Sequence, residues 1–321
     1  MKKIHILTLF LLVPLTSWSR VPDAPDYTDE NGYQYKHFRN EVSGRMIEGR
    51  EKEVQFWGVD TRYSKQREKW AAVKKFTVPT KMVVKRADGK VITMPVTAVD
   101  GNAFCAMPNL EEIIVPEGIT YVNPFALSGT KAKRISIPSS WIDHIYDFHG
   151  YKCQWERITV SNAHPTRCSI NGLMYSKDKS ILYVYPRMRQ GAVTLPTTLK
   201  QIAEDAFREA EHVSTITVPE GVVEIGKSAF YESSASTITL PSTLTKLGIN
   251  ALNCCRQLTT LRCKAATPPA IAVREDDPEW MELWGMNVES LQVYIPKGSR
   301  AAYEKAIWWR KIKNYVEAAQ R

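Results

Sequence analysis

The stretch that decides the fold is Val213-Ser214-Thr215-Ile216-Thr217-Val218-Pro219-Glu220-Gly221-Val222-Val223-Glu224-Ile225-Gly226-Lys227-Ser228-Ala229-Phe230. It starts with alternating apolar and polar residues, which is typical of a short strand with one buried face. A proline and a glycine then mark a turn. An apolar return segment follows and ends in a pair made of a small and a large apolar residue.

This order of features recurs along the chain. Copies run from Pro116 to Leu127, Pro196 to Phe207, Pro219 to Phe230 and Pro241 to Leu252, with an irregular one beginning at Pro95. The alanine of the closing pair stands at positions 103, 126, 206, 229 and 251, so neighbouring copies are 22 to 23 residues apart. Such a period predicts a solenoid, because one unit cannot bury its apolar side and neighbours must stack.

Each copy is preceded by apolar residues in the order apolar-x-x-apolar-x-apolar. The residues between them should point outward and form parallel ladders on one curved face of the stacked strands. The candidate binding residues are Glu112, Arg134, Ser136, Arg157, Thr159, Thr194, Thr215, Thr217, Thr237 and Thr239. The alternative is that the threonines only stabilise the sheet, since threonine suits strands and pairs across them.

The N-terminus has the pattern of an export signal. Lys2 and Lys3 precede an apolar run from Ile4 to Leu15, and small residues follow at Ser17 and Ser19. We expect residues 1–19 to be a signal peptide and the mature chain to begin at Arg20. The apolar run is too short for a retained membrane span, which needs about 20 residues. We therefore expect an exported protein without a transmembrane segment, located in the periplasm, at the cell surface or outside the cell.

The composition and motifs argue against several other functions. The formal net charge of +9 is spread along the chain, so nucleic-acid binding is not expected. No nucleophile elbow, zinc-protease, phosphate-loop or paired-cysteine redox motif occurs, and we expect neither an enzyme nor a cofactor. His144, Asp147, His149 and Cys153 match no established zinc spacing, so no metal is expected. We also expect His164 to be a solvated loop residue.

The six cysteines permit disulfides in an oxidising compartment, but buried free thiols are the favoured interpretation. Cys255 and Cys263 in particular occupy positions of core residues.

The remaining segments predict two caps and an insert. Residues 20–91 form a β-rich N-terminal cap with strands at 32–36, 53–57 and 75–79. Repeats occupy 92–160 and 193–266, a hairpin insert occupies 161–192, and residues 267–321 form a C-terminal cap. The C-terminal cap should hold a strand at 291–296 and a helix opening at Ser299, whose hydroxyl can cap the first turn. The helical spacing there involves Tyr303, Ala306, Ile307, Trp309 and Ile312.

The motifs Leu-x-x-Ile-x-Ile-Pro, Val-x-x-Ile-Gly and Ala-Phe, clearest from Val213 to Phe230, closely resemble the BspA-type leucine-rich repeat of bacterial secreted and surface proteins. The insert motif at 171–179 and the ending at 293–317 also look like elements of that family. The resemblance implies an elongated, exported, non-enzymatic protein that binds surface proteins. This chain departs from the family pattern in a degenerate repeat copy that begins at Pro138 and in having no recognisable surface anchor.

The sequence thus predicts a mainly β, α+β leucine-rich repeat solenoid that binds a protein or glycoprotein through its curved sheet and the insert hairpin, as a monomer. The alternative is a carbohydrate-binding or surface-scaffold module that uses exposed aromatics, for which Trp280 and Trp284 are the best candidates. A hydrolase is the third possibility.

Overall fold

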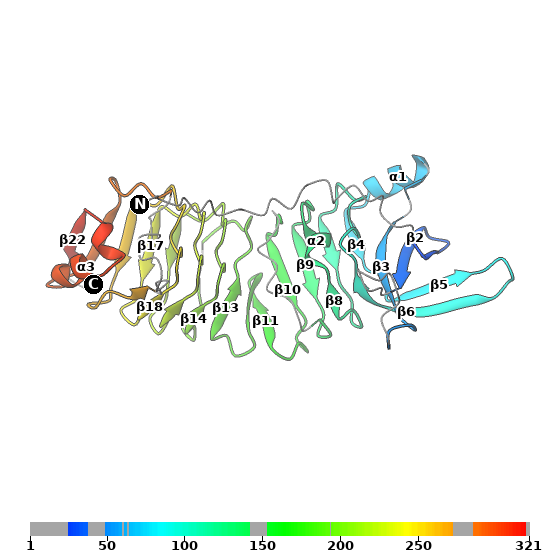
Figure 1. Cartoon of the computed structure of the whole chain (residues 1–321), viewed down its shortest axis with the longest axis horizontal. Helices are drawn as coiled ribbons and strands as arrows, with labels where there is room; N and C mark the ends of the chain where they lie inside the picture. Colours follow the sequence, from blue (N-terminus) through cyan, green and yellow to red (C-terminus); the bar gives the residue numbers. More distant parts are fainter. Residues whose placement is uncertain are drawn as a thin grey trace, which may run out of the picture.

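The computed structural model describes residues 25–37, 49–59, 61–62, 64–141, 153–192, 194–271 and 285–318. These residues form an elongated, mainly β solenoid with few helices (Figure 1). The predicted signal peptide, His144, Asp147, His149, Trp280 and Trp284 lie outside the described residues.

The strands that carry the predicted outward residues, which we call the outward strands, form two parallel sheets along one side of the solenoid. The first contains β4 (Lys75–Thr77), β7 (Glu112–Ile114), β9 (Arg134–Ile137) and β10 (Arg157–Val160). The second contains β15 (Thr215–Thr217), β17 (Thr237–Leu240), β19 (Thr260–Cys263), β21 (Gln292–Pro296) and β22 (Tyr315–Ala318). The first sheet begins at Lys75, inside the range predicted as the N-terminal cap.

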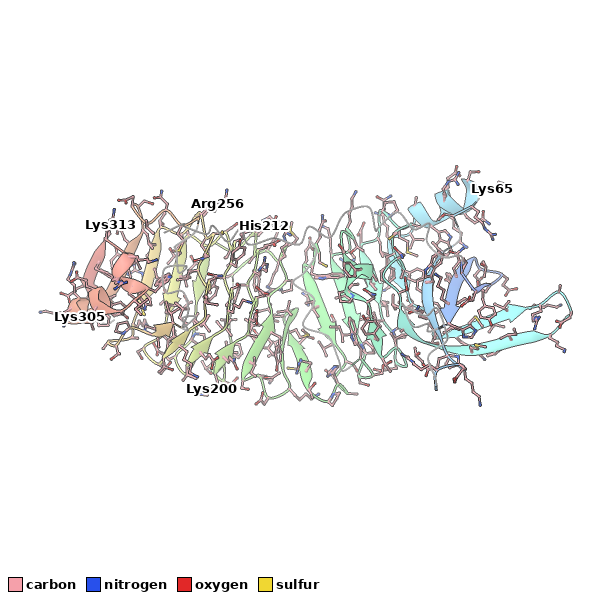
Figure 2. The ribbon with its side chains drawn as sticks, in the orientation of Figure 1. Lys65, Lys200, His212, Arg256, Lys305 and Lys313 are labelled. Carbon is pink, nitrogen blue, oxygen red and sulfur yellow. The ribbon has the colours of Figure 1, made fainter. Side chains whose placement is uncertain are left out.

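The return segments form a further sheet of short strands, which the sequence pattern had not distinguished from coil. Its parallel members are β14 (Gln201–Ile202), β16 (Glu224–Ile225), β18 (Lys246–Leu247) and β20 (Ala270–Ile271). Figure 2 shows Lys200, which precedes β14, at one long edge of the solenoid, and His212 and Arg256 at the opposite edge.

The N-terminal end is a mixed sheet. Its strands are β1 (Tyr27–Thr28), β2 (Tyr33–His37), β3 (Val54–Val59), β6 (Val91–Val99) and β5 (Lys81–Lys85), with β8 (Tyr121–Val122) also paired to β6. The strands predicted at 32–36, 53–57 and 75–79 are therefore present as β2, β3 and β4. The charged run between the last two contains α1 (Ser64–Ala71), of which only Trp70 is buried.

The repeated apolar slots build the core. Both members of the closing pair are buried in every copy, and Ala206, Phe207, Ala229 and Phe230 are fully buried. The aromatic ring of Tyr185 stacks on Phe207 at 4.8 Å, and Phe207 lies 5.4 Å from Phe230. Stacking of one turn on the next thus produces the continuous core that a single unit lacks.

The turns after the outward strands are joined by a carboxylate. The Glu117 side chain accepts the N–H and the hydroxyl of Ser139, each at 2.8 Å. In the repeats that follow the insert, the Glu220 side chain accepts the Ser242 N–H at 3.0 Å and the Ser242 hydroxyl at 2.8 Å. The backbone hydrogen bond from Ser139 is the main reason that the pKa of Glu117 is below its usual value. The alternation of Pro-Glu-Gly with Pro-Ser copies therefore has a direct structural cause.

The insert contains the predicted hairpin, whose strands are largely covered and whose turn at Lys177, Asp178 and Lys179 is exposed. β11 (Arg167–Ile170), β12 (Leu173–Ser176) and β13 (Ile181–Val184) are consecutive antiparallel neighbours, and β13 continues into the return sheet through β14. All four residues of β12 are buried. Leu173 and Tyr175 belong to the C-terminal core, whereas Met174 and Val184 belong to the N-terminal core. We call β11, β12 and β13 the dividing sheet.

His164 is fully buried, so the prediction of a solvated loop residue is wrong. Its Nε2 lies 3.0 Å from the Trp141 carbonyl oxygen, and its Nδ1 accepts the N–H groups of Thr166 and Arg167. The imidazole thereby satisfies backbone groups that approach it from two segments, which a loop exposed to water would not require.

The C-terminal helix also differs in detail from the prediction. α2 (Pro124–Leu127) and α3 (Arg300–Lys305) are short, and a 3-10 turn follows α3 at Trp309–Lys311. The Ser299 hydroxyl does not cap α3 but donates to the Pro296 carbonyl oxygen. Ile307 is exposed, because α3 ends at Lys305 and helical spacing no longer applies beyond it. Tyr303, Trp309 and Ile312 are buried as expected.

All six cysteines are free thiols. Cys255 and Cys263 are buried, as their positions predict.

Candidate binding surface

The predicted ladder residues of the first outward sheet lie side by side. Glu112 pairs with Arg134, and Arg134 pairs with Arg157, in parallel register. Ser136 and Thr159 form the next row. The row begins one strand earlier than predicted, since Lys75 pairs with Glu112. We call the outward residues of β4, β7, β9 and β10 the N-terminal ladder.

The charged row of the N-terminal ladder reads Lys75, Glu112, Arg134 and Arg157, so Glu112 lies between two cations and Arg157 repeats the positive charge of Arg134. The Glu112 carboxylate lies 3.0 Å from Lys75 Nζ and 3.2 Å from Arg134 Nε. The hydrogen bond from Lys75 is the main reason that the pKa of Glu112 is below its usual value. In the positions just before these strands, Lys74 pairs with Glu111 and Lys133 with Glu156. These ion pairs are exposed, so they add little stability and leave a polar surface of mixed charge.

The second outward sheet carries uncharged rows. Thr215, Thr237 and Thr260 occupy one row, and Thr217 and Thr239 begin the other. Because threonine side chains are short, they project little from the sheet and leave this part of the face accessible to a partner. We call the outward residues of β15, β17, β19 and β21 the C-terminal ladder.

The C-terminal ladder ends in an arginine and a tyrosine that the sequence analysis missed. Arg262 follows Thr239 in its row, and Tyr294 follows Arg262. The Arg262 guanidinium lies 4.2 Å from the centre of the Tyr294 ring, and the Tyr294 hydroxyl donates to Gln292 Oε1 at 3.0 Å. The signal was present, because Arg262 lies between buried Leu261 and Cys263, and Tyr294 between buried Val293 and Ile295.

The two ladders do not form one continuous row, and Thr194 is not part of either. Thr194 is exposed and lies outside any strand. The edge of β10 is occupied by the dividing sheet: the Ile158 N–H donates to the Gly172 carbonyl oxygen at 2.9 Å. The Val160 N–H likewise donates to the Ser169 hydroxyl at 3.0 Å. The first outward sheet therefore ends at β10.

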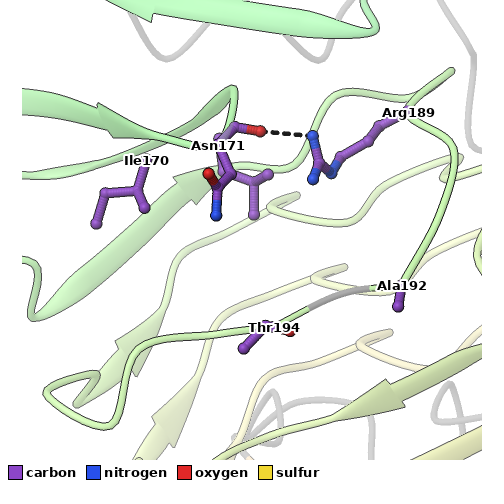
Figure 3. Close-up of a pocket in the computed structure, with 6 residues that line it drawn as sticks. Ile170, Asn171, Arg189, Ala192 and Thr194 are labelled. Atoms are coloured by element: carbon purple, nitrogen blue, oxygen red, sulfur yellow. Dashed lines mark hydrogen bonds between the residues drawn. The ribbon is translucent and has the colours of Figure 1, made fainter.

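A small hollow lies at this interruption (Figure 3). It is lined by Ile170, Asn171, Leu173, Arg189, Ala192 and Thr194 and has a volume of about 50 Å³. Arg189 closes one side by donating to the Asn171 carbonyl oxygen. The hollow is far below the several hundred Å³ typical of small-molecule sites.

The described residues offer little for catalysis. They contain no group of three or more histidine, cysteine or acidic side chains placed to hold a metal ion. Burial raises the pKa of Cys153 to about 11 and that of Cys255 to about 12, so both thiols stay protonated at neutral pH. The ladders provide hydrogen-bonding and charged groups on an open face, which suits recognition of a large partner.

Most of the described tryptophans are in the core. Trp70, Trp141, Trp155, Trp308 and Trp309 are buried, and Trp57 is partly covered, with Lys36 Nζ 4.7 Å from its ring centre. Within the described ranges, the tryptophans therefore form no exposed platform for stacking on sugars.

A family model described as "BspA type Leucine rich repeat region" matches residues 90–175 and 183–267, in six copies. No curated protein is similar enough in sequence to count as a match. Every helix in the part of the chain that the structure describes is too short or too polar to cross a membrane.

Solved structures of bacterial leucine-rich repeat proteins are similar in fold. A leucine-rich repeat protein from Eubacterium ventriosum is 20% identical, with 76% of this chain and 73% of that chain covered and a TM-score of 0.42. The pneumococcal vaccine antigen PcpA is 14% identical, with 92% and 100% covered and a TM-score of 0.33. A leucine-rich cell surface protein from Faecalibacterium prausnitzii is 13% identical, with 92% and 95% covered and a TM-score of 0.35.

Proposed function

Because this chain belongs to the BspA-type leucine-rich repeat family, we propose that it is an exported, non-enzymatic protein that binds a protein or glycoprotein partner through its ladders. Export is supported by the basic residues and apolar run at the N-terminus. A surface-scaffold role is the same proposal applied to several partners at once.

The observation that carries the proposal is the C-terminal ladder with its Arg262–Tyr294 pair. Side chains of known register project from stacked strands, so their spacing is fixed before a partner arrives. A preorganised surface loses less conformational entropy on binding than a flexible one. Tyrosine and arginine are also the residues that most often dominate binding energy at protein interfaces. We therefore place the centre of the contact at Arg262 and Tyr294, with the threonine rows beside it.

The test is a pull-down of surface and extracellular proteins, with glycans assayed in parallel, using the unchanged protein and a double variant. Thr217→Arg with Thr237→Arg places two long cations on neighbouring strands without stacking them in one row or beside Arg262. We expect the affinity of the double variant for the partner to fall by at least about tenfold. Its melting temperature should stay within a few degrees of that of the unchanged protein, because exposed substitutions change stability little.

The matched control is Thr197→Arg with Thr198→Arg, which adds the same charge at exposed positions in a turn away from the ladders. Partner binding should survive in this control. If the ladder variant binds as well as the unchanged protein, or if its melting temperature falls sharply, the threonines serve the sheet and the proposed surface is wrong.

A further inference from the structure

β5 and β6 form a two-stranded arm that projects from the N-terminal end of the solenoid (Figure 1). The strands pair antiparallel from Lys81 opposite Pro95 to Lys85 opposite Val91. The turn at the tip is closed by the Arg86 N–H, which donates to the Lys90 carbonyl oxygen at 2.8 Å. Arms of this kind are marginally stable alone and gain stability when a further strand or surface covers them.

One edge of this arm is open. β5 is the last strand of its sheet, so no strand of the described residues lies on its far side. The Val96 N–H donates to the Thr80 carbonyl oxygen, and the Arg86 N–H donates to the Lys90 carbonyl oxygen. The backbone groups of Thr80, Arg86 and the even-numbered residues between them therefore point toward β6. Alternate residues of an antiparallel strand bond to opposite sides. The backbone N–H and C=O groups of Lys81, Val83 and Lys85 therefore point to the open edge.

The same edge is basic and partly apolar. Lys81, Lys85, Arg86 and Lys90 are all exposed, and none of them forms an ion pair with a residue in the described ranges. Asp88 is the one acidic residue from 81 to 96, and it accepts the Lys90 N–H in the turn. Val83 is 47% exposed and Val91 is 60% exposed, on the same face of the arm.

These charges disfavour a second copy of the arm as the occupant. In an antiparallel pairing of two β5 strands centred on Val83, each Lys81 would lie opposite the Lys85 of the other copy. Like charges directly opposite each other on neighbouring strands are destabilising. Lysines on an edge strand thus prevent self-association while leaving the backbone groups available to a strand of opposite charge.

We propose that β5 binds an extended acidic segment of a partner protein, which adds to the sheet as an antiparallel strand. Strand addition draws affinity from main-chain hydrogen bonds and specificity from alternate side chains. The residues opposite Lys81 and Lys85 are acidic and the residue opposite Val83 is apolar. The recognised pattern is therefore acidic-x-apolar-x-acidic. This contact is separate from the ladders and does not depend on them.

The probe is a fluorescein-labelled peptide with the sequence Thr-Glu-Thr-Val-Thr-Glu-Thr, titrated with the purified protein and followed by fluorescence anisotropy in a buffer of low ionic strength. We expect saturable binding that weakens as salt is added, because exposed charges are screened. A second peptide carries N-methyl groups on both glutamates and the valine, which keeps the charge but removes the pairing N–H groups. Its affinity should be lower by at least about tenfold.

A charge exchange tests the side-chain half of the proposal. Lys81→Glu with Lys85→Glu should lose the acidic peptide and bind the matching Thr-Lys-Thr-Val-Thr-Lys-Thr peptide instead. Lys65→Glu with Lys200→Glu makes the same change in net charge at exposed sites away from the arm and should keep the acidic preference (Figure 2). Amide exchange of Val84, which faces β6, checks that the hairpin remains formed in each variant.

The proposal is overturned if the acidic peptide does not saturate the unchanged protein, or if the N-methylated peptide binds equally well. It is also overturned if the charge exchange leaves the peptide preference unchanged. Since the ladder variants keep the arm intact, failure of ladder binding and failure of arm binding are separate results.

Discussion

At the scale of single residues, His164 shows how the fold sets chemistry that its local sequence does not reveal. Two backbone N–H groups, from Thr166 and Arg167, are directed at Nδ1. Nδ1 must therefore be the acceptor, so the proton is on Nε2, which donates to the Trp141 carbonyl oxygen. Burial lowers the pKa of His164 below the ordinary value of 6.5. The folded protein thus holds this imidazole neutral.

This geometry predicts a loss of stability in mild acid. As the pH falls through about 6.5 the unfolded chain protonates this histidine, whereas the folded chain protonates it only at a lower pH. The unfolded state then binds more protons, and the free energy of unfolding decreases as the pH falls. Urea denaturation at about pH 7.5 and about pH 5.5 measures the difference. In His164→Gln the part of the pH dependence due to this residue should disappear. The control is His212→Gln, at an exposed position, which should keep the pH dependence due to His164. An unchanged pH dependence in His164→Gln would contradict the prediction.

At the scale of the element, glycines after two return strands let neighbouring turns approach closely. A Cβ atom on Gly226 would lie 2.4 Å from the Glu204 backbone nitrogen. A Cβ atom on Gly248 would lie 2.3 Å from the carbonyl carbon of Gly226. Neither distance is possible without backbone movement, so the glycine of the Val-x-x-Ile-Gly motif follows from the stacking distance of the turns.

We expect Gly248→Ala to lower the free energy of unfolding by about 1–3 kcal/mol, the usual cost of overpacking. Urea denaturation measures this loss. The comparison variant is Gly101→Ala, whose Cβ would meet the Phe125 Cβ at 3.3 Å, so its loss should be clearly smaller. Equal stability of Gly248→Ala and the unchanged protein would show that the turns separate without cost.

At the scale of the whole molecule, the dividing sheet couples two cores. Adjacent residues of β12 point to opposite sides, so Met174 packs with the N-terminal core and Tyr175 with the C-terminal core. Repeat proteins propagate stability between neighbours, and the two halves here are coupled through this sheet and through the Met188 N–H, which donates to the Trp155 carbonyl oxygen at 2.9 Å.

Met174→Ala with Val184→Ala should weaken the N-terminal half selectively. Truncation of a buried methionine alone costs about 2–5 kcal/mol, because a cavity remains. Hydrogen exchange should then quicken in β7 and β9 more than in β17 and β19, because opening occurs locally. Leu182→Ala, on the C-terminal side of the sheet, should give the opposite pattern. Uniform loss of protection in both halves would mean that the solenoid unfolds as one unit.

Most of the repeated features were predictable from the sequence, although the rows also contain Lys75, Arg262 and Tyr294 and do not contain Thr194. Buried slots such as Ala229 and Phe230, and the outward rows from Glu112 to Arg157 and from Thr215 to Thr237, follow from a local period. The hairpin of β12 and β13 was also recognisable, because alternation and a polar turn are local signals.

The features that occur once could be seen only in the folded chain. Thr194 matches the outward pattern, yet it lies outside any strand, and the edge of β10 is occupied by Gly172 and Ser169. The middle strand of the dividing sheet, β12, is buried on both faces, because cores from distant segments cover it, whereas the turn of the hairpin is exposed. Periodicity fixes which side of a strand is apolar, whereas edge occupancy and burial on both faces depend on contacts between segments far apart in the chain.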